Sequence, residues 1–337
     1  MLLDFNTIKA VSCGTVRVSL EPEGVLFNRF TQEQSDMYEK KQEGFFYKSQ
    51  ASAGIKLCFR TNSRSLFLKA LVKNVRSRTY FCFDVFANEM PVGYLDNYSD
   101  QELPQDYSEI SFPVGEFSKT FDLGEGEKTV TVHLPWNKKT YLQEIALDDG
   151  ATVEPVKPEK KLLAFGDSIT QGFDALRPSN RYIAQLAKAL NAEEFNKGIG
   201  GERYCPELPS LKDDFTPDYI IVAYGTNDWS SAKKADFEAN AKAFYAALDK
   251  NYPGVKTFVI TPLWRSNLDK QTDFASFDEI ESGIRQAVGG RENTTVIRGF
   301  DLVPHSIDYF GDYGLHPNNE GFRCYFKNLW SQIKDLP

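Results

Sequence analysis

The sequence predicts an α/β domain built on a parallel sheet, preceded by an all-β sandwich. Three observations predict this fold: strict apolar–polar alternation in the first half, a linker-like stretch near residue 150, and apolar strands alternating with amphipathic helices beyond it. A chain of 337 residues is long for one domain and sufficient for two. We therefore expect a β-sandwich accessory domain over residues 1–150, a linker over 151–160 and an α/β domain over 161–337.

Residues 1–150 repeat with a period of two. In the segment KTVTVHLP, Val130, Val132 and Leu134 fall on one side of the chain and polar residues fall on the other. The segments GIKLCFR, SLFLKALVKN and TYFCFDVFAN behave similarly and are separated by Gly, Pro, Asn and Asp. No segment of this half has a helical repeat. The pattern predicts an antiparallel, jelly-roll-like sandwich without helices.

The second half has a different period. The stretch LDDGATVEPVKPEKK combines charge clusters with two prolines, which is typical of a linker. After it, the apolar segments KLLAFG, YIIVAYG, KTFVIT and TTVIRG alternate with predicted helices at 180–190, about 235–250, 274–288 and from about 318 onward. Nearly continuous apolar strands indicate a parallel sheet covered on both faces. Such sheets bind ligands beyond the carboxyl ends of their strands.

Composition disfavours several classes of partner. The net charge of −8 argues against nucleic acid, whose phosphates require a basic face. No apolar run approaches the ~18 residues of a membrane span, and the first residues lack the basic and apolar regions of a signal peptide. Five scattered cysteines without a CxxC pair favour reduced thiols over disulfides or a zinc site. We expect a cytoplasmic protein, and the sequence leaves its oligomeric state open.

Groups suited to acyl transfer follow the ends of two predicted strands. The first strand runs into FGDSITQG, which places Ser168 at the mouth of the sheet, and a later strand runs into GTNDW, which places Asn227 at the same rim. Between them, FNKGIGGERY supplies a glycine pair. A serine nucleophile needs oxyanion donors, each worth roughly 3–4 kcal/mol, and backbone N–H groups and amides supply them. His316, in the loop before the last predicted helix, is the candidate base.

Four blocks, FGDSITQG, NKGIGG, YGTND and GLHPNNEG, resemble in order the sequence blocks of the SGNH (GDSL-type) hydrolase superfamily. The resemblance covers about residues 160–335. It implies a flavodoxin-like hydrolase domain in which Ser168 is the nucleophile and His316 the base. The Ser168 N–H, Gly201 and the Asn227 side chain would form the oxyanion hole. The resemblance implies no metal and no organic cofactor.

The acid of the expected triad departs from the family pattern. Family members usually carry Asp three residues before the histidine, where this chain has Tyr313, and Asp312 lies one residue earlier. In an extended loop, a shift by one residue turns a side chain to the opposite face. Three arrangements remain open: the loop bulges so that Asp312 bonds Nδ1, a backbone carbonyl orients the ring of a Ser–His dyad, or Asp308 or Asp301 takes the role.

A β-sandwich in front of an SGNH domain resembles the arrangement of two-domain carbohydrate acetyl esterases. It implies the removal of short acyl groups from a small-molecule or oligosaccharide ester. Trp264, Arg265 and Trp229 are candidates for substrate contact, although either indole could be a core aromatic. The alternatives are a lipase or thioesterase on longer acyl chains, an acyltransferase, and a catalytically impaired sugar-binding protein. Only the displaced aspartate favours the last.

Overall fold

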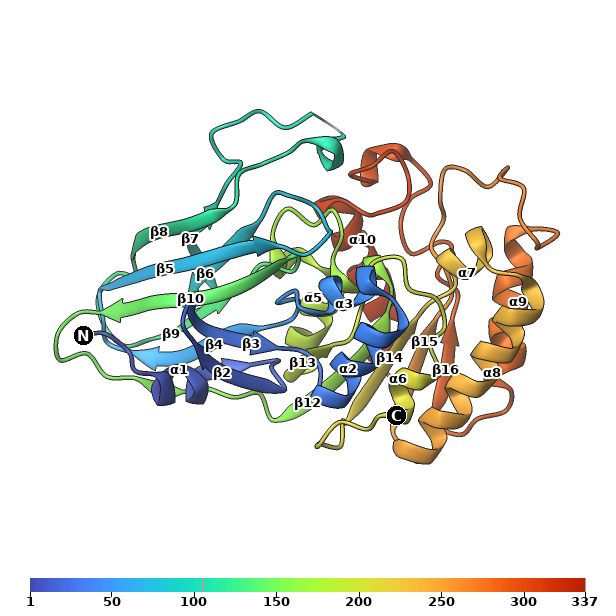
Figure 1. The fold of residues 1–337 in the computed structure, drawn as a ribbon, viewed down its shortest axis with the longest axis horizontal. Helices are drawn as coiled ribbons and strands as arrows, with labels where there is room; N and C mark the ends of the chain where they lie inside the picture. The colour runs from blue at the N-terminus through green and yellow to red at the C-terminus, as the bar shows by residue number, and fades with distance from the viewer. Residues whose placement is uncertain (105, 337) are drawn as a thin grey trace.

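The computed structural model describes residues 1–104 and 106–336. Two antiparallel sheets occupy the N-terminal half, and a parallel sheet covered by helices occupies the C-terminal half (Figure 1). The N-terminus lies at the end of the sandwich remote from the parallel sheet (Figure 1). The two predicted fold classes, a β-sandwich followed by an α/β domain, are therefore confirmed, and the boundaries drawn at 150 and 160 stay a prediction.

The two antiparallel sheets enclose one hydrophobic core. One sheet has the order β2 (Arg17–Glu21), β3 (Gly24–Asn28), β10 (Lys138–Leu147), β5 (Ser65–Asn74), β8 (Gly115–Asp122). The other has the order β1 (Ser12–Cys13), β4 (Lys56–Thr61), β9 (Lys128–His133), β6 (Cys82–Ala87), β7 (Met90–Asp96), with β11 (Glu154–Pro155) paired to β4. The inward side chains that meet in this core include Leu68 of β5, Phe59 of β4 and Val132 of β9. The alternation in the sequence is thus the alternation between core and outer face.

The expectation of no helix in residues 1–150 is wrong. The described residues of this half form three helices, α1 (Phe5–Val11), α2 (Gln32–Lys41) and α3 (Glu43–Ser49), besides the 3₁₀ turn η1 (Tyr107–Glu109). Hydrophobic periodicity misses α2 because its buried side chains are Gln34 and Tyr38, of which only one is apolar. The available signal was the capping box, in which Thr31 and Gln34 satisfy each other's backbone N–H groups.

The parallel sheet has the strand order β13 (Ala192–Asn196), β12 (Lys160–Gly166), β14 (Tyr219–Ala223), β15 (Lys256–Ile260), β16 (Thr294–Ile297). This is the flavodoxin-like order, whose ligand site lies where the chain switches direction beside the first strand. The edge strand β13 was not predicted because it carries two glutamates. One of them, Glu194, is buried in an ion pair with Arg181 at 2.6 Å.

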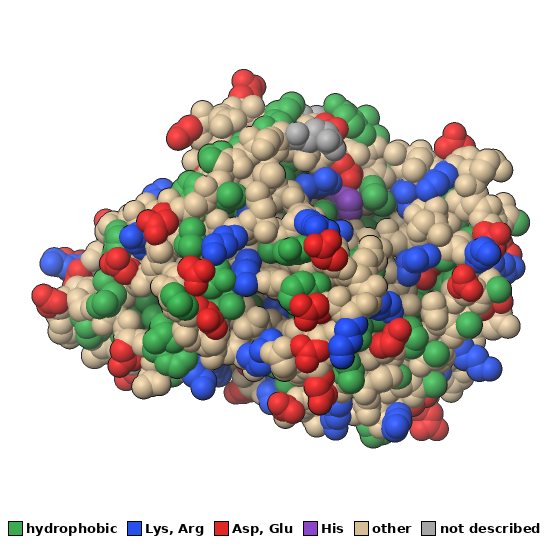
Figure 2. Space-filling view, in the orientation of Figure 1, with side chains coloured by type: hydrophobic (Ala, Val, Ile, Leu, Met, Phe, Trp, Pro, Cys, Tyr) green, Lys and Arg blue, Asp and Glu red, His purple; other side chains and the backbone are tan. Residues whose placement is uncertain are grey.

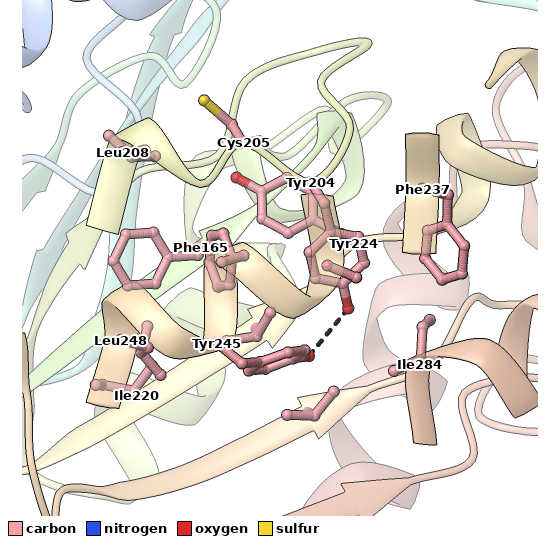
Figure 3. Close-up of a cluster of buried hydrophobic side chains, with 14 of the residues drawn as sticks. Phe165, Tyr204, Cys205, Leu208, Ile220, Tyr224, Phe237, Tyr245, Leu248 and Ile284 are labelled. Atoms are coloured by element: carbon pink, nitrogen blue, oxygen red, sulfur yellow. Dashed lines mark hydrogen bonds between the residues drawn. The ribbon is translucent and has the colours of Figure 1, made fainter. Parts of the chain in front are cut away.

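Helices cover both faces of this sheet, and the four predicted helices are confirmed. Helices α8 (Lys234–Asn251) and α9 (Phe277–Val288), with the short helices α6 (Glu207–Ser210) and α7 (Thr226–Ser231), pack on one face. Figure 3 shows that core around Phe165, with Tyr204 and Tyr245 joined by a hydrogen bond of 3.0 Å. Helices α5 (Tyr182–Ala189) and α10 (Asn319–Ile333) cover the other face. Short elements α4 (Ser168–Gln171), η2 (Pro178–Asn180) and η3 (Ile307–Tyr309) complete the chain.

The two halves interlock through buried polar contacts. Tyr38 of α2 joins the hydrophobic core of the parallel sheet. Arg29, 1% exposed, donates to the carbonyl oxygens of Asn196 at 2.8 Å and Gly198 at 3.0 Å. The N-terminal half therefore reaches the segment that leads into the glycine pair.

The surface carries charges of both signs, interspersed over the face in Figure 2. Across residues 1–104 and 106–336 we find no helix both long and apolar enough to cross a membrane. The five cysteines are unpaired thiols. The cytoplasmic location stays a prediction.

Candidate active site

Ser168 lies at the carboxyl end of β12, as predicted. The strand ends at Gly166, and Asp167 caps α4 by accepting the N–H of Ile169 at 3.0 Å. A side chain at position 166 is excluded because its Cβ would lie 2.2 Å from Oγ1 of Thr170. The turn is therefore tight, and it leaves Ser168 5% exposed as the first residue of α4.

His316 reaches the serine from the loop before α10. Its Nε2 lies 2.8 Å from Oγ of Ser168. Asn318 anchors the loop by accepting the N–H of Gly321 at 3.0 Å, so it is the N-cap of the helix. The imidazole packs against the ring of Phe173, with 5.2 Å between the ring centroids, and is 8% exposed as a residue. The two residues are 148 positions apart in the chain and meet through the sheet.

Asp312 bonds the histidine despite its displaced position. Its Oδ2 lies 2.5 Å from Nδ1 of His316, and its Oδ1 accepts the backbone N–H groups of Leu315 at 3.0 Å and His316 at 2.9 Å. The loop bulges because Tyr313 adopts a left-handed conformation, φ 59°, and Gly314 follows at φ 125°. Of the three arrangements that the sequence left open, the structure has the first.

The other two candidate acids lie elsewhere. Asp301 pairs with Arg298 at 3.2 Å and lies 3.4 Å from Nε2 of His305. Asp308 accepts the hydroxyl of Ser306 at 2.9 Å. Neither carboxylate contacts the ring of His316 among the described residues.

The environment of Asp312 favours its ionised form. Burial alone would raise the pKa of this carboxyl, but the charge of the imidazolium and the hydrogen bonds from His316 and Leu315 outweigh it and hold the pKa well below its usual range. The carboxylate is thus available as an acceptor for Nδ1–H throughout the neutral pH range.

The predicted oxyanion donors surround a tight backbone turn. Gly201 adopts φ 85°, which favours glycine, and Asn227 donates from Nδ2 to the carbonyl oxygen of Glu202 at 3.0 Å. The neighbouring Gly200 is held at both ends, since its N–H bonds Oε1 of Gln171 at 2.8 Å and its carbonyl accepts Nζ of Lys48 at 2.7 Å. The structure therefore joins Asn227 to Glu202, the residue that follows the glycine pair, and the oxyanion role stays a prediction.

Glu202 is a buried acid beneath this turn. It is 2% exposed, and the hydroxyl of Tyr224 donates to its Oε2 at 2.9 Å. Burial raises the pKa of Glu202 from 4.5 to about 8, against the opposing effect of the hydroxyl groups beside it. The folded chain therefore binds this proton more tightly than the unfolded chain does.

Replacing Glu202 with glutamine should stabilise the protein at alkaline pH. With the pKa raised from 4.5 to about 8, the group's stabilisation is complete below the lower value and is lost as the pH rises through the upper one. Glutamine has no proton to lose, so the variant should gain on the order of 5 kcal/mol of unfolding free energy relative to wild type between acid and alkaline pH. Thermal unfolding across this range measures the gain, with the exposed Glu238→Gln as a control. An equal pH dependence of Tm in wild type and Glu202→Gln would contradict the prediction.

Trp229 is a core residue, and the expectation that it contacts substrate is wrong. It is 1% exposed and packs edge-on against Phe277 at 5.0 Å between ring centroids, because the helix α7 turns it into the core beneath α9. Trp264 is half-buried and stacks on the imidazole of His305 at 5.6 Å, with Phe310 at 5.4 Å. One face of the Trp264 indole is therefore already covered by protein, and its substrate role stays a prediction.

Arg265 supports the start of α7, the helix that carries Asn227. It is 6% exposed, and its Nη1 donates to the carbonyl oxygen and to Oγ1 of Thr226 at 3.1 and 3.0 Å. Its guanidinium also lies 5.0 Å from the ring centroid of Trp229. Arg265 thus holds Thr226, the neighbour of Asn227, whereas its direct contact with substrate stays a prediction.

Sequence reasoning missed two charged residues beside His316. Oδ2 of Asp174 lies 3.6 Å from Nδ1 of His316, and Arg78 of the N-terminal half lies 3.4 Å from the same nitrogen. The donor atoms of Asp174, Asp312 and His316 lie within 4.8 Å of one another, a spacing that a metal ion could use, but the guanidinium already pairs with both carboxylates. No local motif marks Arg78, since it comes from a part of the chain 238 residues away from His316.

Comparison with known proteins agrees with this geometry. The model of the GDSL-like lipase/acylhydrolase family matches residues 164–324. No curated protein matches the chain.

Among solved structures, the chain is similar over almost its whole length to several proteins. They include the salicylyl-acyltransferase SsfX3 from a tetracycline biosynthetic pathway (TM-score 0.77, 19% identity, 97% of this chain and 95% of that one). A GDSL-like lipase from Bacteroides ovatus has a TM-score of 0.76 at 18% identity (99% and 97%). A family two carbohydrate esterase from Clostridium thermocellum, solved with cellohexaose, has a TM-score of 0.65 at 14% identity (96% and 98%). These identities establish a shared fold. The family match, taken by itself, identifies a GDSL-like lipase/acylhydrolase domain over residues 164–324.

Proposed function

We propose that this protein is a serine esterase that removes short acyl groups, acetyl above all, from a carbohydrate. The observation that carries the proposal is the continuous series of hydrogen bonds from Ser168 through His316 to Asp312, at 2.8 and 2.5 Å, beyond the carboxyl ends of a parallel sheet. The family match supports the reaction class.

The mechanism has two steps that share one acyl-enzyme. Nε2 of His316 takes the proton of Ser168 as its Oγ attacks the acyl carbonyl. Asp312 accepts the Nδ1–H bond, which holds the ring in the tautomer that leaves Nε2 free to accept a proton. The Ser168 N–H, Gly201 and Asn227 receive the oxyanion. The imidazolium then protonates the leaving sugar oxygen, and a water activated by the same ring releases the carboxylic acid.

The choice of a carbohydrate ester rests on architecture. The β-sandwich precedes the hydrolase domain, as it does in the carbohydrate esterases of similar fold, one of which holds cellohexaose. The alternative of a catalytically impaired sugar-binding protein drew its only support from the displaced aspartate, and the contact between Asp312 and His316 removes that support. A lipase or thioesterase and an acyltransferase would use the same residues, so substrate tests must separate them.

A chain-length series of p-nitrophenyl esters tests the proposal. We expect turnover that depends on Ser168 and a kcat/KM that falls by about tenfold or more from acetate to octanoate, as an enzyme specific for short acyl groups requires. Acetate release from acetylated oligosaccharides should follow. A kcat/KM that rises with chain length would favour the lipase reading, and acetyl transfer to an added sugar acceptor would favour the acyltransferase.

A further inference from the structure

We propose that Arg78, supplied by the β-sandwich, is a positioning residue of the catalytic site: it holds Asp174 and Asp312 beside His316 and offsets one of their two negative charges. The inference rests on the proposed function, since it concerns the same serine–histidine pair. It gives the N-terminal half a part in the chemistry.

Arg78 lies on the connection between β5 and β6 and reaches the histidine loop. Its Nε and Nη2 donate to Oδ1 and Oδ2 of Asp174 at 2.7 and 3.0 Å, a bidentate pair. The same Nη2 lies 3.4 Å from Oδ2 of Asp312 and 3.4 Å from Nδ1 of His316. The Arg78 side chain is 17% exposed, and its guanidinium covers the ring of Phe173 at 5.5 Å from the centroid. A planar, permanently charged fork can serve both carboxylates at once.

The sandwich holds Arg78 firmly in this position. The backbone carbonyl oxygen of Arg78 accepts hydrogen bonds from Nζ of Lys138 at 2.8 Å and from Nδ2 of Asn137 at 3.2 Å. Both donor residues are fully buried. Asn137 also bonds the carbonyl oxygen of Tyr80, on the same connection. The arginine is thus anchored through its backbone by the start of β10, whereas an arginine on a loose surface loop would be free to leave.

The partner of Arg78 is held by the same half of the protein. Asp174 is fully buried in a left-handed conformation, φ 67°, six residues after Ser168. The hydroxyl of Tyr80 donates to its Oδ1 at 3.0 Å, and the hydroxyl of Tyr107 donates to its carbonyl oxygen at 2.5 Å. The N-terminal half therefore fixes both members of the Arg78–Asp174 pair.

Charge decides what the pair does for the histidine. The charged groups that face His316 are Asp312 on its own loop, Asp174 and Asp167 near the nucleophile, and Arg78 from the sandwich. Asp174 and Arg78 together add no net charge beside a neutral imidazole. Without Arg78, the second carboxylate would act on the ring unopposed and favour the imidazolium, which cannot take the proton of the serine.

The pH dependence of kcat/KM tests this role. In Arg78→Gln, the acid limb of the pH profile of kcat/KM for p-nitrophenyl acetate should move to higher pH by about one unit. The kcat of this variant should fall by about tenfold or more. In Asp174→Asn, the acid limb should move to lower pH. The double variant Arg78→Gln/Asp174→Asn restores the net charge, so its acid limb should return to the wild-type position. Arg78→Lys keeps the positive charge but loses the planar guanidinium. Its acid limb should therefore stay at the wild-type pH, whereas its kcat should fall.

A matched control comes from the same connection. Arg76 pairs with Glu43 at 3.0 Å and is 52% exposed, so Arg76→Gln should leave both kcat and the acid limb at their wild-type values. An unmoved acid limb in Arg78→Gln, or a double variant no closer to wild type than Arg78→Gln, would overturn the proposal. An acid limb in Asp174→Asn that moves to higher pH would also overturn the proposal. Asp174→Asn therefore still tests the proposal if Arg78→Gln does not fold.

A readout without turnover separates this inference from the proposed function. The chain has three histidines, so the signal that disappears in His316→Ala identifies the ring Cε1–H resonance of His316. The titration midpoint of this resonance should be about one pH unit higher in Arg78→Gln than in wild type. In the double variant it should return to the wild-type value. Absent ester turnover in wild type would refute the proposed function alone, whereas equal midpoints in wild type and Arg78→Gln would refute the role of Arg78.

Discussion

Replacing Ser168 with alanine should abolish ester turnover, lowering kcat by about 10⁴- to 10⁶-fold on p-nitrophenyl acetate. The physical reason is that Oγ of Ser168 lies 2.8 Å from Nε2 of His316, and the described residues place no other hydroxyl on that nitrogen. Without the hydroxyl, no acyl-enzyme forms, and water must attack the ester directly. The residual rate then comes from binding and the oxyanion donors alone.

The measurement is a comparison of wild type, Ser168→Ala and Ser282→Ala, a serine on the exposed face of α9. Ser168→Ala removes one oxygen atom and should leave Tm unchanged within a few degrees. A loss of activity in this variant therefore reflects the loss of the nucleophile and not unfolding. Labelling by a fluorophosphonate should occur in wild type and in Ser282→Ala and vanish in Ser168→Ala. Turnover in Ser168→Ala close to that of wild type would rule out this serine as the nucleophile.

Asp312→Asn should lower kcat by about 10³- to 10⁴-fold. An asparagine amide can donate to Nδ1, which favours the tautomer with its proton on Nε2, where it cannot accept the proton of Ser168. The opposing charge that stabilises the imidazolium is lost as well. The effect should hold across the neutral pH range, because the wild-type carboxylate is ionised there. Burial acts to raise the pKa of Asp312, but the adjacent imidazolium and the hydrogen bonds from His316 and Leu315 outweigh burial and hold this pKa well below its usual range.

The matched control is Asp308→Asn, since Asp308 lies on the same segment and bonds Ser306 rather than the histidine. It should retain wild-type kcat. Near-normal turnover in Asp312→Asn would show that the ring is oriented by another group, and a severe loss in Asp308→Asn would point to the wrong acid.

The sequence by itself determined the two fold classes and most of the residues that meet at the site. Alternation with a period of two and apolar strands between amphipathic helices are local patterns, because burial on one face is a property of neighbouring residues. The carboxyl ends of parallel strands share one edge of their sheet, so Ser168 after β12 and Asn227 after β14 had to lie at the same rim. The helix capped by Asn318 placed His316 at the entrance of α10.

Only the tertiary structure decided how the histidine is held and which aromatic residues are buried. The left-handed Tyr313 lets Asp312 reach Nδ1, and a non-glycine residue rarely adopts that conformation, so a sequence pattern does not reveal it. The burial of Trp229 depends on α9, which a local pattern does not position. Arg78 stands 234 residues from Asp312 in the chain, and their contact exists because the sandwich is docked on the hydrolase domain. Contacts of this range depend on how whole elements pack, whereas the patterns read from a sequence extend over only a few turns or strands.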